Sequence, residues 1–147
     1  MADDQVNAYA TRDDLRDRLG ERIFEEIYSF LLSAEAKSDL ESAAAEIDGS
    51  ISARYVLPVA GGRSLALLQD WNLTLAEERA YARAAGSEFS EKIKDRVAVV
   101  RHSLELIREG GFRLPDAVEI GSGGTGATLA LAQSETPVFT RSRLRGF

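Results

Sequence analysis

The residues best suited to chemistry form a glycine-rich run, Gly-Ser-Gly-Gly-Thr-Gly, at positions 121–126. The run fits the G-x-G-x-x-G pattern of dinucleotide-binding loops and follows a strand-like stretch at 117–120. Such a loop needs a helix whose amino terminus meets the pyrophosphate, and a second parallel strand bearing an acidic residue about 20 positions further on. Pro137 interrupts the space for these elements, and position 144 is Leu144. The pattern therefore favours a linker, with a small nucleotide-binding enzyme or regulator as the alternative.

The other chemistry-bearing residues do not form a recognisable catalytic or metal-binding set. The chain has one histidine, His102, and no cysteine, which excludes a disulfide framework, a thiolate metal site and a cysteine nucleophile. The carboxylate pairs at 13–14, 25–26 and 77–78 are adjacent in sequence, whereas di-metal bundles use ligands three or four residues apart on a helix. We therefore expect no enzymatic activity, no cofactor and no metal site, and we expect His102 to occupy a solvated helix position.

The carboxyl-terminal segment combines bulky apolar residues with arginines. Its candidate docking residues are Phe139, Arg141, Arg143, Leu144, Arg145 and Phe147. Burying two phenylalanine side chains contributes several kcal/mol at about 25 cal/mol per Å². Such a segment is expected to dock on its own helices, on a neighbouring subunit or on another protein. Three arginines in an acidic protein give only a small salt-dependent affinity for nucleic acid.

Charge is unevenly distributed along the 147 residues, whose net charge is −6. Residues 1–48 carry 13 acidic and 5 basic residues, whereas 49–147 carry 11 and 13. This polarity suits a head-to-tail partner, although two solvated ends would produce it as well. The length fits one domain, and 44% hydrophobic with 29% charged residues is typical of soluble proteins. No long apolar stretch and no signal-peptide pattern is present, so we expect a cytoplasmic protein with no membrane contact.

Apolar periodicity predicts a mainly α protein, a bundle of about four to five helices. We expect helices over 12–19, over 21–32, from Ser38 towards Tyr55, from Ser64 to Gly86, and over 87–110. The residues expected to pack in the core or between subunits are Ile47, Ile51, Tyr55, Trp71, Val97, Val100 and Leu104. Leu65 is expected to point inward as well.

After Pro115 the helical period is lost. Glycines and a short alternating stretch predict an extended, partly β carboxyl-terminal arm. We therefore divide the chain into a helical body at 1–116 and a glycine-rich linker with an extended docking arm at 117–147.

Three motifs stand in order along the chain with compatible spacing. They are Tyr-Ala-Thr-Arg-Asp-Asp-Leu at 9–15, then Ala-Glu-Ile-Asp-Gly at 45–49 with Ala-Arg-Tyr-Val-Leu-Pro at 53–58, and Phe-Thr-Arg-Ser-Arg-Leu-Arg-Gly-Phe at 139–147. Together they resemble the Mu-type phage head-tail connector family, often described only as a domain of unknown function.

This resemblance implies a structural neck protein of a tailed phage, prophage or gene-transfer particle. Proteins of this kind form rings, commonly of about twelve copies, that join the portal to the tail. The implied partners are other copies of the chain, the portal protein and the next neck or tail-completion protein, with DNA passing through without sequence-specific binding. The docking residues at 139–147 would contact portal or a neighbouring subunit, first in the host cytoplasm and then in the particle neck.

Overall fold

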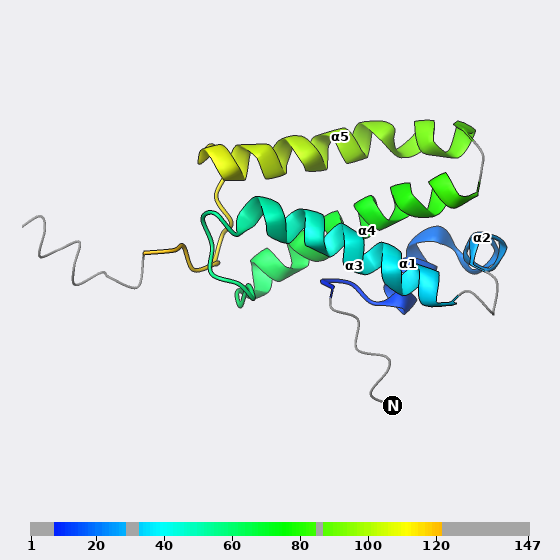
Figure 1. Ribbon diagram of the computed structural model, residues 1–147, viewed down its shortest axis with the longest axis horizontal. Coiled ribbons are helices and arrows are strands. Elements are labelled where there is room, and N and C mark those ends of the chain that lie inside the picture. Colours follow the sequence, from blue (N-terminus) through cyan, green and yellow to red (C-terminus); the bar gives the residue numbers. More distant parts are fainter. Residues whose placement is uncertain (1–7, 29–32, 85–86, 122–147) are drawn as a thin grey trace, which may run out of the picture.

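The computed structural model describes residues 8–28, 33–84 and 87–121. Its helices are α1 (Arg12–Leu19), α2 (Glu21–Ile27), α3 (Ser33–Ile51), α4 (Gly62–Arg83) and α5 (Ser87–Glu109). The long helices α3, α4 and α5 lie side by side, with α4 antiparallel to both neighbours, and α1 and α2 pack near the end where α3 begins (Figure 1). The expected mainly α bundle is confirmed. None of the helices in these ranges combines the length and apolar character needed to cross a bilayer.

The β character expected for the carboxyl-terminal arm is not supported. Within the described ranges, the β structure consists of one isolated antiparallel bridge, between Tyr55 and Glu119. The pairing stops there because Pro58 follows closely and cannot donate a ladder hydrogen bond. Residues 122–147 lie outside the described residues.

Helix α1 begins where the sequence predicts it, at a reciprocal cap. The Asp14 amide donates to Oγ1 of Thr11 (3.2 Å), and the Thr11 amide donates to Oδ2 of Asp14 (2.8 Å). The hydrogen bond from the Thr11 amide lowers the pKa of Asp14 below its ordinary value. These bonds satisfy amides that a helix start otherwise leaves unpaired.

Helix α2 ends at Ile27, not at Leu32 as expected. The backbone leaves the helical region at Tyr28, whose φ is −109° and ψ is 92°. Its ring is buried, and its hydroxyl donates to Oδ2 of Asp39 (2.6 Å). This contact with α3 turns the chain inward and ends the helix, while residues 29–32 lie outside the described ranges.

Helix α3 starts at Ser33, so the expected start at Ser38 is wrong. Asp39, which the sequence assigns to a first turn, is buried and accepts hydrogen bonds from Nε and Nη2 of Arg83 on α4 (2.7 and 2.9 Å). The helix also ends at Ile51, before Tyr55, because Tyr55 pairs with Glu119 instead.

Helix α4 is the centre of the bundle, and residues 71–77 are buried on every side of the helix. Within this run Asn72 is fully buried. Its side chain accepts a hydrogen bond from the Ala10 amide (3.0 Å) and donates one to the Leu40 carbonyl (3.0 Å). One amide group thereby ties the segment before α1 and the middle of α3 to the central helix.

The seven residues expected in the core or in subunit packing are all buried within the single chain: Ile47, Ile51, Tyr55, Trp71, Val97, Val100 and Leu104. Leu65 differs from expectation, because 38% of its surface is exposed. It lies on a face of α4 that α3 and α5 do not cover.

Ion pairs connect the three long helices along one surface seam. Glu46 of α3 pairs with Arg79 of α4 (2.9 Å) and Arg101 of α5 (2.8 Å), and Arg101 also pairs with Glu78 (2.8 Å). Glu46 and Glu78 together raise the pKa of Arg101 above its ordinary value. Because these groups are partly exposed, each pair contributes about 0–1 kcal/mol. The main consequence of the seam is that acidic groups of α3 and α4 are neutralised there.

Candidate docking site

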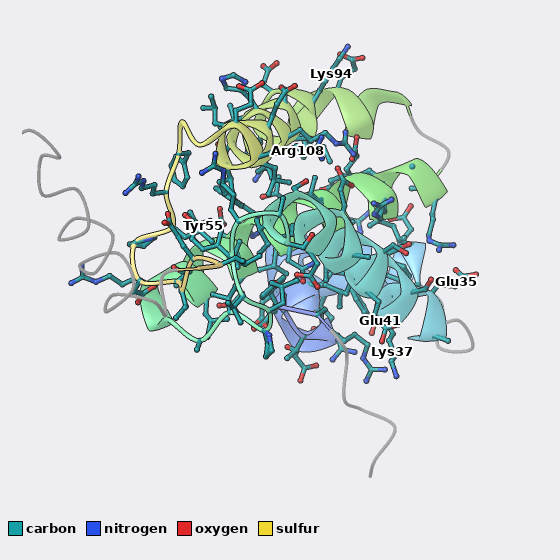
Figure 2. All side chains as sticks on the ribbon, turned by 60° about the vertical axis from the view of Figure 1, so that its left-hand side comes forward. Glu35, Lys37, Glu41, Tyr55, Lys94 and Arg108 are labelled. Carbon is teal, nitrogen blue, oxygen red and sulfur yellow. The ribbon has the colours of Figure 1, made fainter. Side chains whose placement is uncertain are left out.

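Residues 112–121 lead from α5 towards the arm, and hydrogen bonds hold them on the body. The Val56 amide donates to the Val118 carbonyl (2.8 Å), and the Ile120 amide donates to the Arg54 carbonyl (2.7 Å). Below this contact, the Leu114 amide donates to the hydroxyl of buried Tyr55 (2.9 Å). Tyr55 lies towards the end of the molecule where this segment leaves the bundle, and Glu35 lies at the opposite end (Figure 2).

The same segment supplies the cap of α4. Oδ2 and Oδ1 of Asp116 accept hydrogen bonds from the amides of Arg63 (2.9 Å) and Ser64 (2.8 Å), and the Asp116 amide donates to Oγ of Ser64 (3.3 Å). A Cβ on Gly61 would clash with the carboxylate and the backbone carbonyl of Asp116, so only glycine leaves room for this contact. The sequence places Ser64 near this helix start but misses Asp116, which lies 52 residues away. We call the contacts of residues 112–121 with 54–64 the clasp.

We expect replacement of Asp116 by alanine to loosen the clasp. Hydrogen bonds from Ser64 and from the Arg63 amide hold the pKa of Asp116 below its ordinary value of 3.8, so the carboxylate remains the acceptor at neutral pH. Because this pKa is lowered on folding, the contribution of the carboxylate is present above pH 3.8 and is lost as the pH falls through the lowered value. Acid should therefore loosen the clasp only below about pH 4.

Amide hydrogen exchange measures this effect. At neutral pH, the Val56 and Ile120 amides should exchange at least tenfold faster in Asp116→Ala than in the unmodified protein. Asp13→Ala is the matched control, because Asp13 is also an exposed carboxylate at a helix start but belongs to α1. Equal exchange in the two variants would contradict a clasp held by Asp116.

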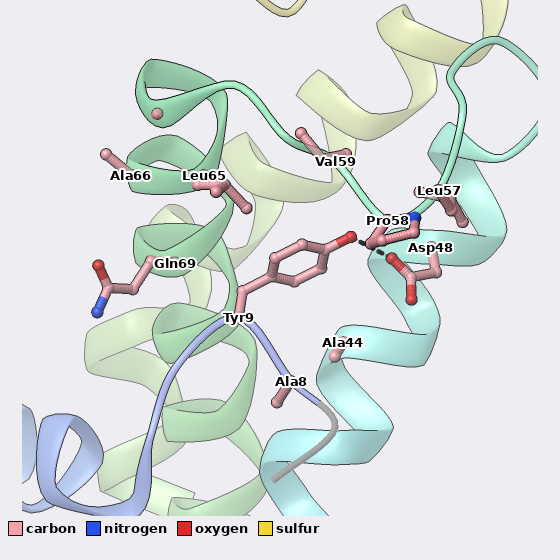
Figure 3. Close-up of a pocket in the computed structure, with 11 residues that line it drawn as sticks. Ala8, Tyr9, Ala44, Asp48, Leu57, Pro58, Val59, Leu65, Ala66 and Gln69 are labelled. Carbon is pink, nitrogen blue, oxygen red and sulfur yellow. Dashed lines mark hydrogen bonds between the residues drawn. The ribbon is translucent and has the colours of Figure 1, made fainter. Parts of the chain in front are cut away.

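A groove of about 760 Å³ opens beside the clasp. Its walls come from four places in the chain: the segment before α1, α3, the loop that follows α3, and α4 (Figure 3). The lining residues include Tyr9, Asp48, Leu57, Pro58, Val59, Leu65 and Gln69. Apart from Asp48, these side chains carry no charge. The groove is therefore suited to apolar or aromatic side chains, and Asp48 can pair with a basic group beside them.

Tyr9, on the segment before α1, forms one wall of the groove, and its ring points towards Asp48 on α3 (Figure 3). Its hydroxyl donates a hydrogen bond to Oδ1 of Asp48. Burial, together with the bond to Asp48 and the charge on it, raises the pKa of Tyr9 well above its ordinary value. Tyr9 therefore remains a neutral donor throughout the physiological pH range and fixes the Asp48 carboxylate at the groove wall.

The groove brings together residues that the sequence analysis does not place in one site. Tyr9 opens the first motif, Asp48 belongs to the second, and Leu57 and Pro58 end the stretch that follows it. The signal that could have found this site is that both Tyr9 and Asp48 belong to the motifs that carry the family resemblance. Periodicity gives no indication of the contact, because Tyr9 and Asp48 are 39 residues apart.

Other residues singled out from the sequence lie elsewhere. The docking residues Phe139, Arg141, Arg143, Leu144, Arg145 and Phe147 fall outside the described residues, as do positions 122–126 of the glycine-rich run. Gly121 has a φ of 87° and follows an antiparallel bridge, not the parallel strand that a dinucleotide-binding loop requires. His102 is exposed on α5, and the described ranges contain no group of three potential metal ligands.

The comparison with protein families gives a match over most of the chain. The model for the family described as "Bacteriophage Mu, Gp36" matches residues 9–121. The matched region begins at the groove residue Tyr9 and includes the five helices and the clasp. No curated protein and no solved structure gives a match. The chain therefore belongs to the bacteriophage Mu Gp36 family, a family of Mu-type phage proteins.

Proposed function

We propose that this protein is a head-tail connector, or adaptor, of a tailed phage, prophage or gene-transfer particle. In this role copies of the chain form a ring, of about twelve subunits, between the portal and the next neck or tail-completion protein. The observation that carries the proposal is membership of a Mu-type phage family over residues 9–121. The ring assembles in the host cytoplasm and then resides in the neck of the particle.

The placement of the clasp supports this proposal. A subunit of a cyclic ring needs two different surfaces, because each copy uses one face to contact the next copy and another to receive the previous one. The clasp holds residues up to Ile120 at one end of the helical bundle. The basic arm therefore starts from a fixed point, from which it can reach portal or a neighbouring subunit.

Charge placement supports passage of DNA without tight binding. Glu21, Glu25 and Glu26 are exposed on the short helix α2, where Arg22 is the basic residue. Acids of α3 and α4, by contrast, pair with arginines in the seam. An acidic face repels DNA phosphates at distances up to about 10 Å at ordinary salt. We expect the exposed acidic residues of 1–48, including those of α2 but not the buried Asp39 or the seam residue Glu46, to face the channel.

The test is assembly with the cognate portal. Purified protein is mixed with portal rings, and the products are examined by mass measurement and negative-stain microscopy, with portal alone as the control. The proposal expects an added ring below the portal and a mass increase of about twelve chains. Portal rings of unchanged mass would overturn it.

A further inference from the structure

We propose that, in the isolated protein, the groove beside the clasp holds the last ten residues of the same chain, residues 138–147. This inference concerns the free protein and is independent of the proposed connector function. It rests on the chemistry of the groove, on the point where the described chain ends, and on the composition of the final segment.

The chemistry of the groove matches side chains of the final segment. Leu57 and Leu65 line the groove and leave 36% and 38% of their surfaces exposed. Tyr9 holds the carboxylate of Asp48 at the same wall. A volume of about 760 Å³ accommodates more than one large side chain. An aromatic residue could therefore cover the leucines while a neighbouring arginine meets the carboxylate.

The final segment supplies both kinds of group. Residues 136–147 contain no acidic residue, and two phenylalanines flank three closely spaced arginines: Phe139, Arg141, Arg143, Arg145 and Phe147. Burial of one phenylalanine would remove about 150–250 Å² of surface from water. The same arginines would be drawn towards Asp48, because the groove wall carries that negative charge.

The position of the clasp brings the segment close to the groove. The Val56 amide is bonded to the Val118 carbonyl, and the next residue along, Leu57, already lines the groove. Gly121, the last described residue, therefore follows shortly after Val118, whose carbonyl is bonded to the loop that lines the groove. Val56, Val118 and Ile120 are about half exposed there and extend the apolar surface from the groove to the clasp.

The tether favours the same chain over a second copy. Phe139 lies 18 residues beyond Gly121, and a chain of that length spans at most about 60 Å. Such a tether holds the segment at an effective concentration in the millimolar range. A second copy would have to be present at similar concentration to compete, so a weak interaction suffices within one chain.

Cross-linking of the full-length protein tests this inference, because the chain has no cysteine. Cysteine is introduced at Val138 and at Ala66, which lines the groove, and the pair is treated with a short bis-maleimide. The control pair combines Val138→Cys with Val99→Cys, because Val99 is 65% exposed on α5 and does not line the groove. We expect the groove pair to give at least fivefold more cross-linked product, with the mass of a single chain.

A second comparison tests whether binding in the groove is what produces the cross-link. Adding Leu65→Lys to the groove pair should reduce the yield to that of the control pair, whereas Leu65→Met should preserve it. Leu65 is exposed, so neither change disturbs the core. Equal yields from the two cysteine pairs, or no effect of Leu65→Lys, would overturn the inference. A product with twice the chain mass would overturn it in favour of a second copy. No portal is present, so failure here leaves the connector proposal standing.

Discussion

Replacing Asn72 by alanine is expected to lower the free energy of unfolding by about 2–4 kcal/mol. Asn72 is fully buried in α4 and bonds both the Ala10 amide and the Leu40 carbonyl. The substitution leaves the Ala10 amide buried without its partner, which costs about 1–3 kcal/mol. The Leu40 carbonyl keeps its bond within α3 and loses a second hydrogen bond, worth about 1 kcal/mol. The affected amide adjoins Tyr9, so the change should also loosen one wall of the groove.

Urea denaturation followed by circular dichroism measures this difference. Ser103→Ala is the control, because its hydroxyl bonds the Val99 carbonyl within α5 and lies near the surface. That variant should remain within about 0.5 kcal/mol of the unmodified protein. If Asn72→Ala were no more destabilising than Ser103→Ala, the role of Asn72 as a tie between three segments would be wrong.

Deleting residues 138–147 is expected to abolish addition of the protein to portal rings while leaving the helical body folded. The deletion removes all six candidate docking residues, which supply the bulky apolar groups and the arginines of the arm. It leaves intact the described bundle, whose core lies between residues 10 and 114. Loss of two buried phenylalanine side chains and their arginine contacts would weaken a docking interaction by several kcal/mol.

Co-sedimentation with portal measures the loss, and circular dichroism verifies that helix content is retained. Two full-length variants distinguish the loss of the segment's side chains as a whole from the loss of its arginine charges. One replaces residues 138–147 with glycine and serine, and the other changes the three arginines Arg141, Arg143 and Arg145 to alanine. The first should behave as the deletion, and the second should bind more weakly and lose its salt dependence. Undiminished co-sedimentation of the deleted protein would count against a docking role for the segment.

Local features of the fold could be predicted from the sequence because their causes are local. Thr11 and Asp14 cap α1 from three residues apart, and the four-three spacing from Ile93 to Ile107 defines the buried face of α5. Leu65 shows the limit of such spacing. Its position on the helix suits burial, yet it is exposed, because burial also depends on whether another element covers that face.

The features that sequence patterns missed depend on residues far apart in the chain. Helix α3 begins at Ser33, so Asp39 lies in its interior, where it pairs with Arg83, 44 residues away. The cap of α4 comes from Asp116, 52 residues beyond the helix start. The groove, likewise, needs Tyr9 to meet Asp48. Spacings of three or four residues describe one helix and contain no information about which distant segment packs against it.

These distant contacts also bear on the order in which the chain folds. Ala10 and Asn72 are 62 residues apart, and Tyr55 and Leu114 are 59 apart. Closing such loops costs entropy that the adjacent helices α4 and α5 do not incur when they pair as a hairpin. We therefore infer that the α4–α5 hairpin forms before the groove and clasp do. A newly made chain would then fix residues 112–121 on its body only in the last steps of folding, so that partly folded copies would not present the arm from a fixed point.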